Sequence, residues 1–352
     1  MSKRQTGFWI FVFLLIPAII SAQEVFQTPE GSYSTRKLSD SLDTGTTNSL
    51  LIRAAVNLPG KITLNTAKTK LIKIAYYKKA KASDKDKAID YIDLIAVVLD
   101  RTPEAIRLEM RAPNPAPWES GTEWGMVETE ITVPEKCFVH IEAPMFDVDA
   151  IGPFSGVEIP SSLGKIDVSN VLEKLEIATS NRRVNVTDIS GDIAISTTNS
   201  ILSAKNLVAL DDRAEIENEH GDIRIDGFTG EISVESSYGR ISISSFNVRG
   251  QRNIIRGMSG PISLEINELR DSQLRITNRF EDVEVTLPDE TSATMSLAVD
   301  AGGKIEVSNI NVKPELIEQN RMNLVAGKGT STITSSVRGS GNIYIRGSNE
   351  KD

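Results

Sequence analysis

Residues 214–243, AEIENEHGDIRIDGFTGEISVESSYGRISI, contain the pattern that decides the fold. Apolar residues alternate with polar ones up to Ile216, a polar turn ending in Gly221 follows, and the alternation resumes at Ile223. The same phrase is then repeated through a second turn that ends in Gly239. Because successive side chains of a strand point to opposite faces, each phrase predicts two half-buried strands joined by a tight turn.

The phrase recurs throughout residues 157–307. Eight repeats are located by the last apolar residue of each first strand and the first apolar residue of the second: Ile159/Ile166, Ile177/Val184, Ile195/Ile201, Ile216/Ile223, Val234/Ile241, Ile255/Ile262, Ile276/Val283 and Val299/Ile305. The step between pairs is 18, 18, 21, 18, 21, 21 and 23 residues. A near-constant step with strand alternation inside it indicates a β-solenoid, in which each repeat is one coil. We therefore predict an all-β protein whose stack has about eight coils of roughly 20 residues.

The alternation also predicts which side chains fill the solenoid. Among the predicted inward positions only Asn253 and Ser203 are polar. A further apolar residue in each coil, such as Ile189, suggests a third, shorter side. The glycines that precede many second strands suggest turns with positive φ. Polar residues occupy matching turn positions and are expected to form stacked hydrogen-bond ladders, and the alternative is a polar surface for glycans: Thr179-Ser180-Asn181, Thr197-Thr198-Asn199, Ser236-Ser237 and Thr277-Asn278.

The N-terminus predicts export. Residues 1–22 resemble a secretory signal, with Lys3 and Arg4 before an apolar run and Ser21-Ala22 at the cleavage point. The run is shorter than the roughly 20 residues that span a bilayer, so we expect no stable membrane insertion after cleavage. An uncleaved anchor is the alternative. The lone cysteine, Cys137, cannot form an internal disulfide, and we expect it to be a buried apolar residue.

The rest of the chain divides by composition. We predict a linker over 23–49, an N-terminal β-rich cap region over 50–150 that continues into the solenoid, the solenoid itself over 151–347, and a tail over 348–352. A capping pattern predicts one short helix over roughly 84–93. The last phrase, 341–345, is expected to be a terminal strand that protects the exposed edge of the stack.

Two features offer binding contacts. Trp118 and Trp124 lie in a proline-rich loop, where their rings could stack on a sugar or insert into a partner, or could instead seal the open end of the solenoid. A run of lysines over 78–87 could contact an anionic partner, but interleaved aspartates favour an ordinary solvated helix face. The net charge of −9 without a basic stripe argues against nucleic acid and against anionic lipid.

The sequence contains little that points to catalysis. The two histidines, His140 and His220, are far apart, and no metal-ligand spacing, P-loop or nucleophile motif is present, so we predict no metal and no cofactor. Some β-helices cleave polysaccharides with clustered carboxylates. One acidic cluster here could serve that chemistry, although acidic residues are common on every face: Glu215, Glu217, Asp222 and Asp226.

The Gly-x-Ile-x-Ile phrases, such as Gly221–Ile225, together with the turn at Leu58-Pro59-Gly60 and the hairpin after Thr132-Val133-Pro134, carry a family resemblance. The chain resembles the adhesin families of exported bacterial proteins, including autotransporter-adhesin head domains, over approximately residues 50–346. The resemblance implies a right-handed parallel β-helix in the cell envelope, at the cell surface or outside the cell. These families share no catalytic residues.

We therefore expect an exported, non-enzymatic, adhesin-like module that binds an envelope protein or a glycan. One alternative is a carbohydrate-active lyase or hydrolase that uses the acidic cluster. The other is a structural scaffold of the envelope that is partnered with a membrane protein.

Overall fold

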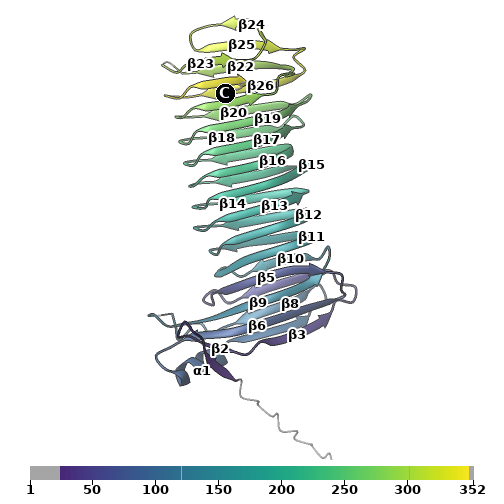
Figure 1. Cartoon of the computed structure of the whole chain (residues 1–352), viewed down its shortest axis with the longest axis vertical. Helices are drawn as coiled ribbons and strands as arrows, with labels where there is room; N and C mark the ends of the chain where they lie inside the picture. Colours follow the sequence, from purple (N-terminus) through teal and green to yellow (C-terminus); the bar gives the residue numbers. More distant parts are fainter. Residues whose placement is uncertain (1–23, 120, 301, 349–352) are drawn as a thin grey trace, which may run out of the picture.

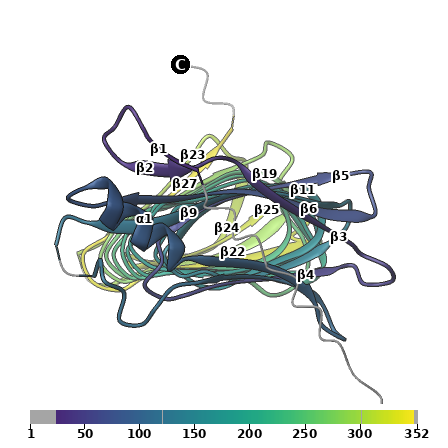
Figure 2. The ribbon, with the colours of Figure 1, turned by 90° about the horizontal axis from the view of Figure 1, so that it is seen from below.

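A computed structural model describes residues 24–119, 121–300 and 302–348. The predicted signal peptide and all but the first residue of the predicted tail lie outside this range. The chain forms an elongated stack of strands, with its one described helix at the N-terminal end (Figure 1). The protein is all-β and solenoid-like, as predicted. Seen along the stack, the strands form two faces of a flattened cross-section (Figure 2).

Each regular coil contributes a strand segment to each face, and equivalent segments pair in parallel. Face 1 contains β5 (Gly60–Ala67), β9 (Trp124–Pro134), the first parts of β11 (Phe146–Ser162), β12 (Ile166–Thr179), β15 (Leu202–Asn218) and β16 (Ile223–Ser236), and also β13 (Val184–Ser190), β17 (Ile241–Val248), β19 (Ile262–Leu269), β21 (Val283–Leu287), β27 (Ile343–Gly347) and β23 (Ile305–Ser308). Face 2 contains β8 (Ile106–Arg111), β4 (Ser49–Ala54), β10 (Phe138–Glu142), the second parts of β11, β12, β15 and β16, and also β14 (Asp192–Thr197), β18 (Asn253–Gly257), β20 (Gln273–Asn278), β26 (Ser331–Val337) and β22 (Ala293–Val299).

The apolar side chains of both faces meet in one continuous core. The predicted inward residues are buried, except Ile201, Ser203, Ile305 and Val307. Even the polar Asn253 is buried, and it is satisfied by accepting a hydrogen bond from Ile232 N (3.1 Å) and donating one to Arg249 O (2.7 Å).

The register predicted for the third coil is wrong by one residue. Leu202 and Ala204 are buried, whereas Ile201 is 42% exposed. Leu202 pairs with Val184 on one side and Ile223 on the other, so this coil keeps the same seven-residue offset from Ile195 as most others. Adjacent isoleucine and leucine residues left the local pattern ambiguous, and pairing with both neighbouring coils decides between them.

The predicted third side is a short segment between the two faces, which begins where long strands bend out of face 1 and in which Phe228 pairs with Leu207 and with Phe246. The apolar residues assigned to it, such as Ile189 and Phe228, are buried just after the bend. A column of residues with left-handed backbone makes the bend in successive coils: Asn170, Asp188, Asn206, Gly227 and Ser245. Asn206 Nδ2 donates to Asp188 Oδ1 at 2.8 Å, so this column also forms side-chain hydrogen bonds between coils.

The reason for the glycines before second strands differs from the prediction at several positions. Gly239 and Gly260 do not have positive φ, but a Cβ on Gly239 would lie 1.8 Å from Gly221 O, and one on Gly260 would lie 2.1 Å from Gly239 O. Neighbouring coils therefore approach too closely at this turn for any side chain.

The N-terminal end is closed by antiparallel strands and the helix. The segment expected to be a linker forms β1 (Val25–Gln27), β2 (Tyr33–Thr35) and β3 (Leu38–Asp43), of which β2 and β3 pair with β6 (Leu71–Lys81). Polar contacts rather than an apolar pattern hold this segment, as when Thr35 Oγ1 accepts from Lys78 N at 3.2 Å. The helix α1 (Lys85–Asp93) begins after the cap Asp84, and β7 (Ala96–Arg101) follows it and pairs with β8.

Each end of the stack is interlocked, in the sense that one coil is inserted between two others out of sequence order. At the C-terminal end the chain passes from β20–β21 to β22–β23, forms the hairpin β24 (Val312–Ile317) and β25 (Arg321–Ala326), and then returns. The last coil, β26–β27, lies between the two coils that precede it in sequence, because β26 pairs with β20 and β22, and β27 with β21 and β23. The prediction that 341–345 form a protective edge strand is therefore wrong.

The N-terminal end has the same arrangement. The coil β4–β5 lies between the coil β8–β9 and the coil that begins at β10, since β4 pairs with β8 and β10 while β5 pairs with β9 and β11. At each end an antiparallel strand covers the outermost coil, β6 on β9 and β25 on β22. The chain itself thus covers the outermost coil on both faces at the N-terminal end, where β7 also pairs with β8, and on face 2 at the C-terminal end.

Candidate functional site

The turns that lead from face 2 to face 1 stack into one edge of the protein. Buried polar side chains hold these turns from inside: Ser236 Oγ donates to Gly239 O at 3.0 Å, and Asn278 Nδ2 donates to Gly260 O and to Glu281 O, both at 2.9 Å. Because both turns are fixed from within, the residues at their tips project in a regular column. The outermost residues of six successive turns form what we call the tip edge: Asn181, Asn199, His220, Tyr238, Ser259 and Phe280.

Backbone hydrogen bonds tie each tip to the turn before it. Tyr238 N donates to Glu219 O at 3.0 Å, Ser259 N to Ser237 O at 3.0 Å, and Phe280 N to Met258 O at 3.1 Å. The expected polar ladder exists at one end of this edge, where Asn199 Nδ2 donates to Asn181 Oδ1 at 2.9 Å. Further along the edge, aromatic residues take the place of the asparagines.

The aromatic part of the tip edge is solvent-exposed. His220 and Tyr238 stack with ring centroids 4.6 Å apart and an interplanar angle of 14°. Tyr238 is 56% exposed, Phe280 44% and Met258 38%. Rigid turns that present exposed aromatic rings are a feature of binding surfaces rather than of a solvated solenoid face.

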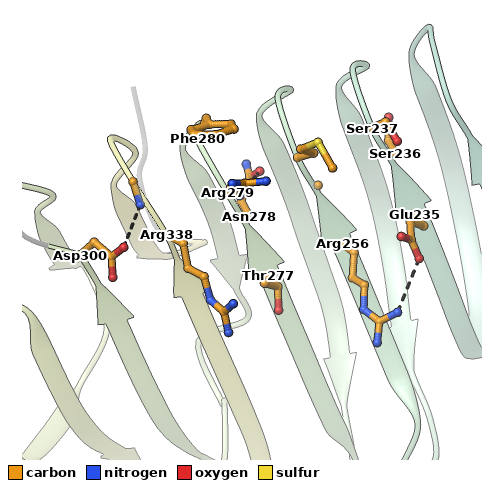
Figure 3. Close-up of a pocket in the computed structure, with 13 residues that line it drawn as sticks. Glu235, Ser236, Ser237, Arg256, Thr277, Asn278, Arg279, Phe280, Asp300 and Arg338 are labelled. Carbon is orange, nitrogen blue, oxygen red and sulfur yellow. Dashed lines mark hydrogen bonds and ion pairs between the residues drawn. The ribbon is translucent and has the colours of Figure 1, made fainter.

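Phe280 and Met258 line a groove of about 550 Å³ at the ends of β16, β18, β20 and β26 (Figure 3), and Tyr238 follows directly after its lining residue Ser237. Three arginines line it, of which Arg256 pairs with Glu235 at 3.5 Å. The Arg279 guanidinium lies over the Phe280 ring, 4.9 Å from its centroid. Among the residues that the structure describes, neither Arg279 nor Arg338 forms an ion pair, and both are exposed.

The two carboxylates of the groove already have partners. Glu235 faces Arg256, and Asp300 Oδ2 accepts from Gly339 N at 3.2 Å. Three guanidinium groups against two carboxylates give the groove a net positive charge on a chain whose net charge is −9. Local charge therefore favours an anionic ligand group here.

The two tryptophans predicted as binding candidates have different environments. Trp118 is buried, packs edge-on against Tyr91 of α1 at 5.4 Å, and donates from Nε1 to Asn57 O at 3.4 Å. Its ring therefore seals the N-terminal end and is not available to a sugar. Trp124 begins β9, pairs with Lys81 and is partly exposed, far from the groove.

The acidic cluster does not converge. Glu215 and Glu217 lie on the part of β15 that belongs to face 2, whereas Asp226 lies on the part of β16 that belongs to face 1. Asp222 precedes β16 and is engaged by Arg224 Nη2 at 2.9 Å. Hydrogen bonding and the nearby arginine hold the pKa of the Asp222 carboxyl below its usual value. The four carboxylates are thus spread over face 2, the turn and face 1, and they do not converge in one groove.

The lysine run is mostly used within the fold. Lys78 is buried, and burial lowers the pKa of its ammonium group, which donates to Ile92 O at 3.4 Å. Lys79 pairs with Glu128 at 2.6 Å and Lys87 with Glu123 at 2.8 Å. These contacts leave little of the run free for an anionic partner.

Cys137 is buried, and burial raises the pKa of its thiol to about 12, so it is not a reactive nucleophile. His140 lies between Glu158 and Glu142, with Nδ1 2.9 Å from Glu158 Oε2 and Nε2 3.1 Å from Glu142 Oε1. Within the described ranges, no group of three or more His, Cys, Asp or Glu side chains could hold a metal ion. No helix in that same part of the chain has the length and apolar character needed to cross a membrane.

The sequence-based reasoning missed Tyr238 and Phe280. Aligning the turns of successive coils would have placed both in one column with His220, because each lies at the same point after its face 2 strand. The arginines could not be assigned in this way, because Arg338 lies beside Arg279 only through the insertion of β26 next to β20.

Comparison with solved structures finds distant similarities. A "putative cell adhesion protein" from Clostridium sporogenes is 13% identical, with 89% of this chain and 99% of that chain covered and a TM-score of 0.20. A "putative adhesin" from Bacteroides fragilis is 10% identical, with 88% and 97% covered and a TM-score of 0.28. A "putative lipid binding protein" from Parabacteroides distasonis is 9% identical, with 88% and 96% covered and a TM-score of 0.28. These values are too low for the roles of those proteins to be assigned to this one.

No curated protein matches the chain. A protein family does match it, over residues 56–279, which include most of the N-terminal cap region and the stack as far as β20. With well over half of its length matched, this chain belongs to the Toastrack DUF4097 family.

Proposed function

We propose that this protein is an exported, non-enzymatic, adhesin-like binding module of the bacterial cell envelope, and that its tip edge is the binding surface. The observation that carries the proposal is the column of exposed rings on rigid turns beside the arginine-lined groove. Elsewhere the stack is largely explained by its own packing and by ion pairs across strands, such as Lys174–Glu158 between β12 and β11.

Two sequence-based expectations are part of this proposal. Export rests on the signal-like residues 1–22. The winding is taken as that of a right-handed parallel β-helix, because crossovers between parallel strands are almost always right-handed. Fractionation of cells that express the full chain would distinguish a location at the cell surface, in the periplasm or outside the cell.

The four carboxylates that were candidates for polysaccharide cleavage do not converge. Glycosidases of either stereochemistry need two carboxyl groups within about 10 Å across one bond. Only Glu215 and Glu217 share a face, and neither of them lines the groove beside the tip edge, which supports binding over hydrolysis at that groove. The scaffold alternative differs in its partner, which would be a membrane protein of the same cell.

Binding of the purified protein to envelope fractions tests the proposal. The double variant Tyr238→Ala/Phe280→Ala should lose binding, because it removes the exposed rings without touching the core. Phe26→Ala is the matched control, since Phe26 is 47% exposed at the other end of the molecule. Binding that is unchanged in the double variant would place the surface elsewhere. Crosslinking to one membrane protein, independent of the tip edge, would support the scaffold instead.

A further inference from the structure

We propose that the tip-edge groove binds a linear polysaccharide that carries carboxylate groups, such as a chain of uronic acids. This inference rests on the proposed function and adds the chemical class of the ligand. The aromatic rings of the tip edge would contact the faces of the sugars, and Arg279 and Arg338 would bind the carboxylates.

The spacing of the rings suits an extended ligand that runs along the stack. Tyr238 and Phe280 belong to turns two coils apart, which is about 9.6 Å for coils separated by about 4.8 Å. The turn between them carries the short Ser259 and, beside it, the 38% exposed Met258, whose flexible apolar side chain lines the groove. Aromatic rings provide flat apolar contact area at low conformational cost, and the C–H face of a sugar ring matches it. The stacked His220 extends the same platform by one further coil.

The two arginines without ion pairs favour a negatively charged ligand. Backbone pairing places Arg279 and Arg338 at equivalent positions of adjacent coils, because Asn278 pairs with Val337 and Arg338 N donates to Asn278 O at 3.0 Å. A guanidinium group presents a planar fork that binds a carboxylate through two parallel hydrogen bonds. Contact with the Phe280 ring orients Arg279 beside the aromatic platform before any ligand arrives.

Two other anionic polymers fit less well. An acidic peptide that binds by strand addition needs a free sheet edge, but the backbone N–H groups of these turns already donate to the preceding coil. A nucleic acid would need many phosphate contacts, whereas Arg279 and Arg338 are the two arginines of the groove lining that form no ion pair within the described part of the chain. The observations therefore favour the polysaccharide.

Titration calorimetry of the full chain with polygalacturonate tests the inference. The controls are the same polymer with its carboxyl groups reduced, polyglutamate and a single-stranded oligothymidylate. We expect binding to polygalacturonate alone, weakened by added salt. Arg279→Gln and Arg338→Gln should each reduce the affinity about tenfold, as expected for a lost charged hydrogen bond.

Arg275→Gln is the matched control, because Arg275 is an exposed arginine on the same strand β20 but does not line the groove. It should leave the affinity unchanged. Equal binding of the reduced polymer, of polyglutamate or of the oligonucleotide would overturn the inference, and so would equal losses in all three arginine variants. If polygalacturonate fails to bind while envelope binding still depends on Tyr238 and Phe280, the ligand class is wrong and the proposed function stands.

Discussion

Replacing Ile343 by alanine tests the insertion of the last coil. Ile343 in β27 is fully buried and pairs with Val283 of β21 on one side and with Ile305 of β23 on the other. Truncating a buried isoleucine costs about 2–5 kcal/mol, a large part of the roughly 5–15 kcal/mol that stabilises a typical domain. The matched control is Ile317→Ala, which makes the same change on the outer strand β24 where the side chain is 64% exposed. Ile317→Ala should lower the free energy of unfolding by less than about 0.5 kcal/mol.

Urea unfolding followed by circular dichroism measures the two free-energy changes, and hydrogen exchange locates them. Because β27 is paired on both sides, Ile343→Ala should lower amide protection in β21 and in β23 together. A terminal edge strand would affect one neighbour only. Equal costs for the two variants, or a loss of protection confined to a single neighbouring strand, would refute the inserted position of β27.

Three further predictions follow from the packing. Cysteines at Glu284 and Tyr344 should form a disulfide on oxidation, because these residues are partners on adjacent strands. Cysteines at Glu284 and Glu306, two strands or about 9.6 Å apart, should not, and non-reducing electrophoresis that shows the opposite would contradict the topology. Gly239→Ala should lower the free energy of unfolding by about 1–3 kcal/mol, since its Cβ meets the carbonyl of the coil before it, and an unchanged Tm would count against that contact. Cys137 should react with Ellman's reagent in urea but not in the native protein, because burial raises the pKa of its thiol to about 12, and native labelling would disprove its burial.

The sequence predicts the regular part of the stack well because each coil repeats the same physical constraint. An aliphatic residue at every second position must face the narrow interior, so residues such as Ile223 and Val234 could be placed without any structure. The alternation predicted the wrong register at Ile201, because Ile201 and the adjacent Leu202 are both apolar. It also failed at 23–49, where edge strands are held by backbone pairing and polar contacts that leave no apolar period.

The order of the coils and most of the candidate site could not be predicted. A local pattern shows that a segment belongs to some coil, but only long-range packing decides which two coils it contacts. The groove depends on that order, since Arg338 reaches Arg279 only across the inserted strand β26. Trp118 was the more conspicuous residue in the sequence, yet it is buried at the end of the stack, whereas Phe280 is half-exposed at an unremarkable turn.

The interlocked ends limit how a protein of this kind can change its length. A simple solenoid can gain or lose a repeat at either terminus, because the outermost coil has a free edge. Here the coils β4–β5 and β26–β27 have neighbours on both sides, so an added terminal repeat finds no edge to extend. Duplication is compatible with the fold only in the central region, for instance beside β13 and β14, where consecutive coils also follow each other in space. The length of the rod, and with it the distance between the N-terminal end and the tip-edge groove, is therefore adjustable from the middle alone.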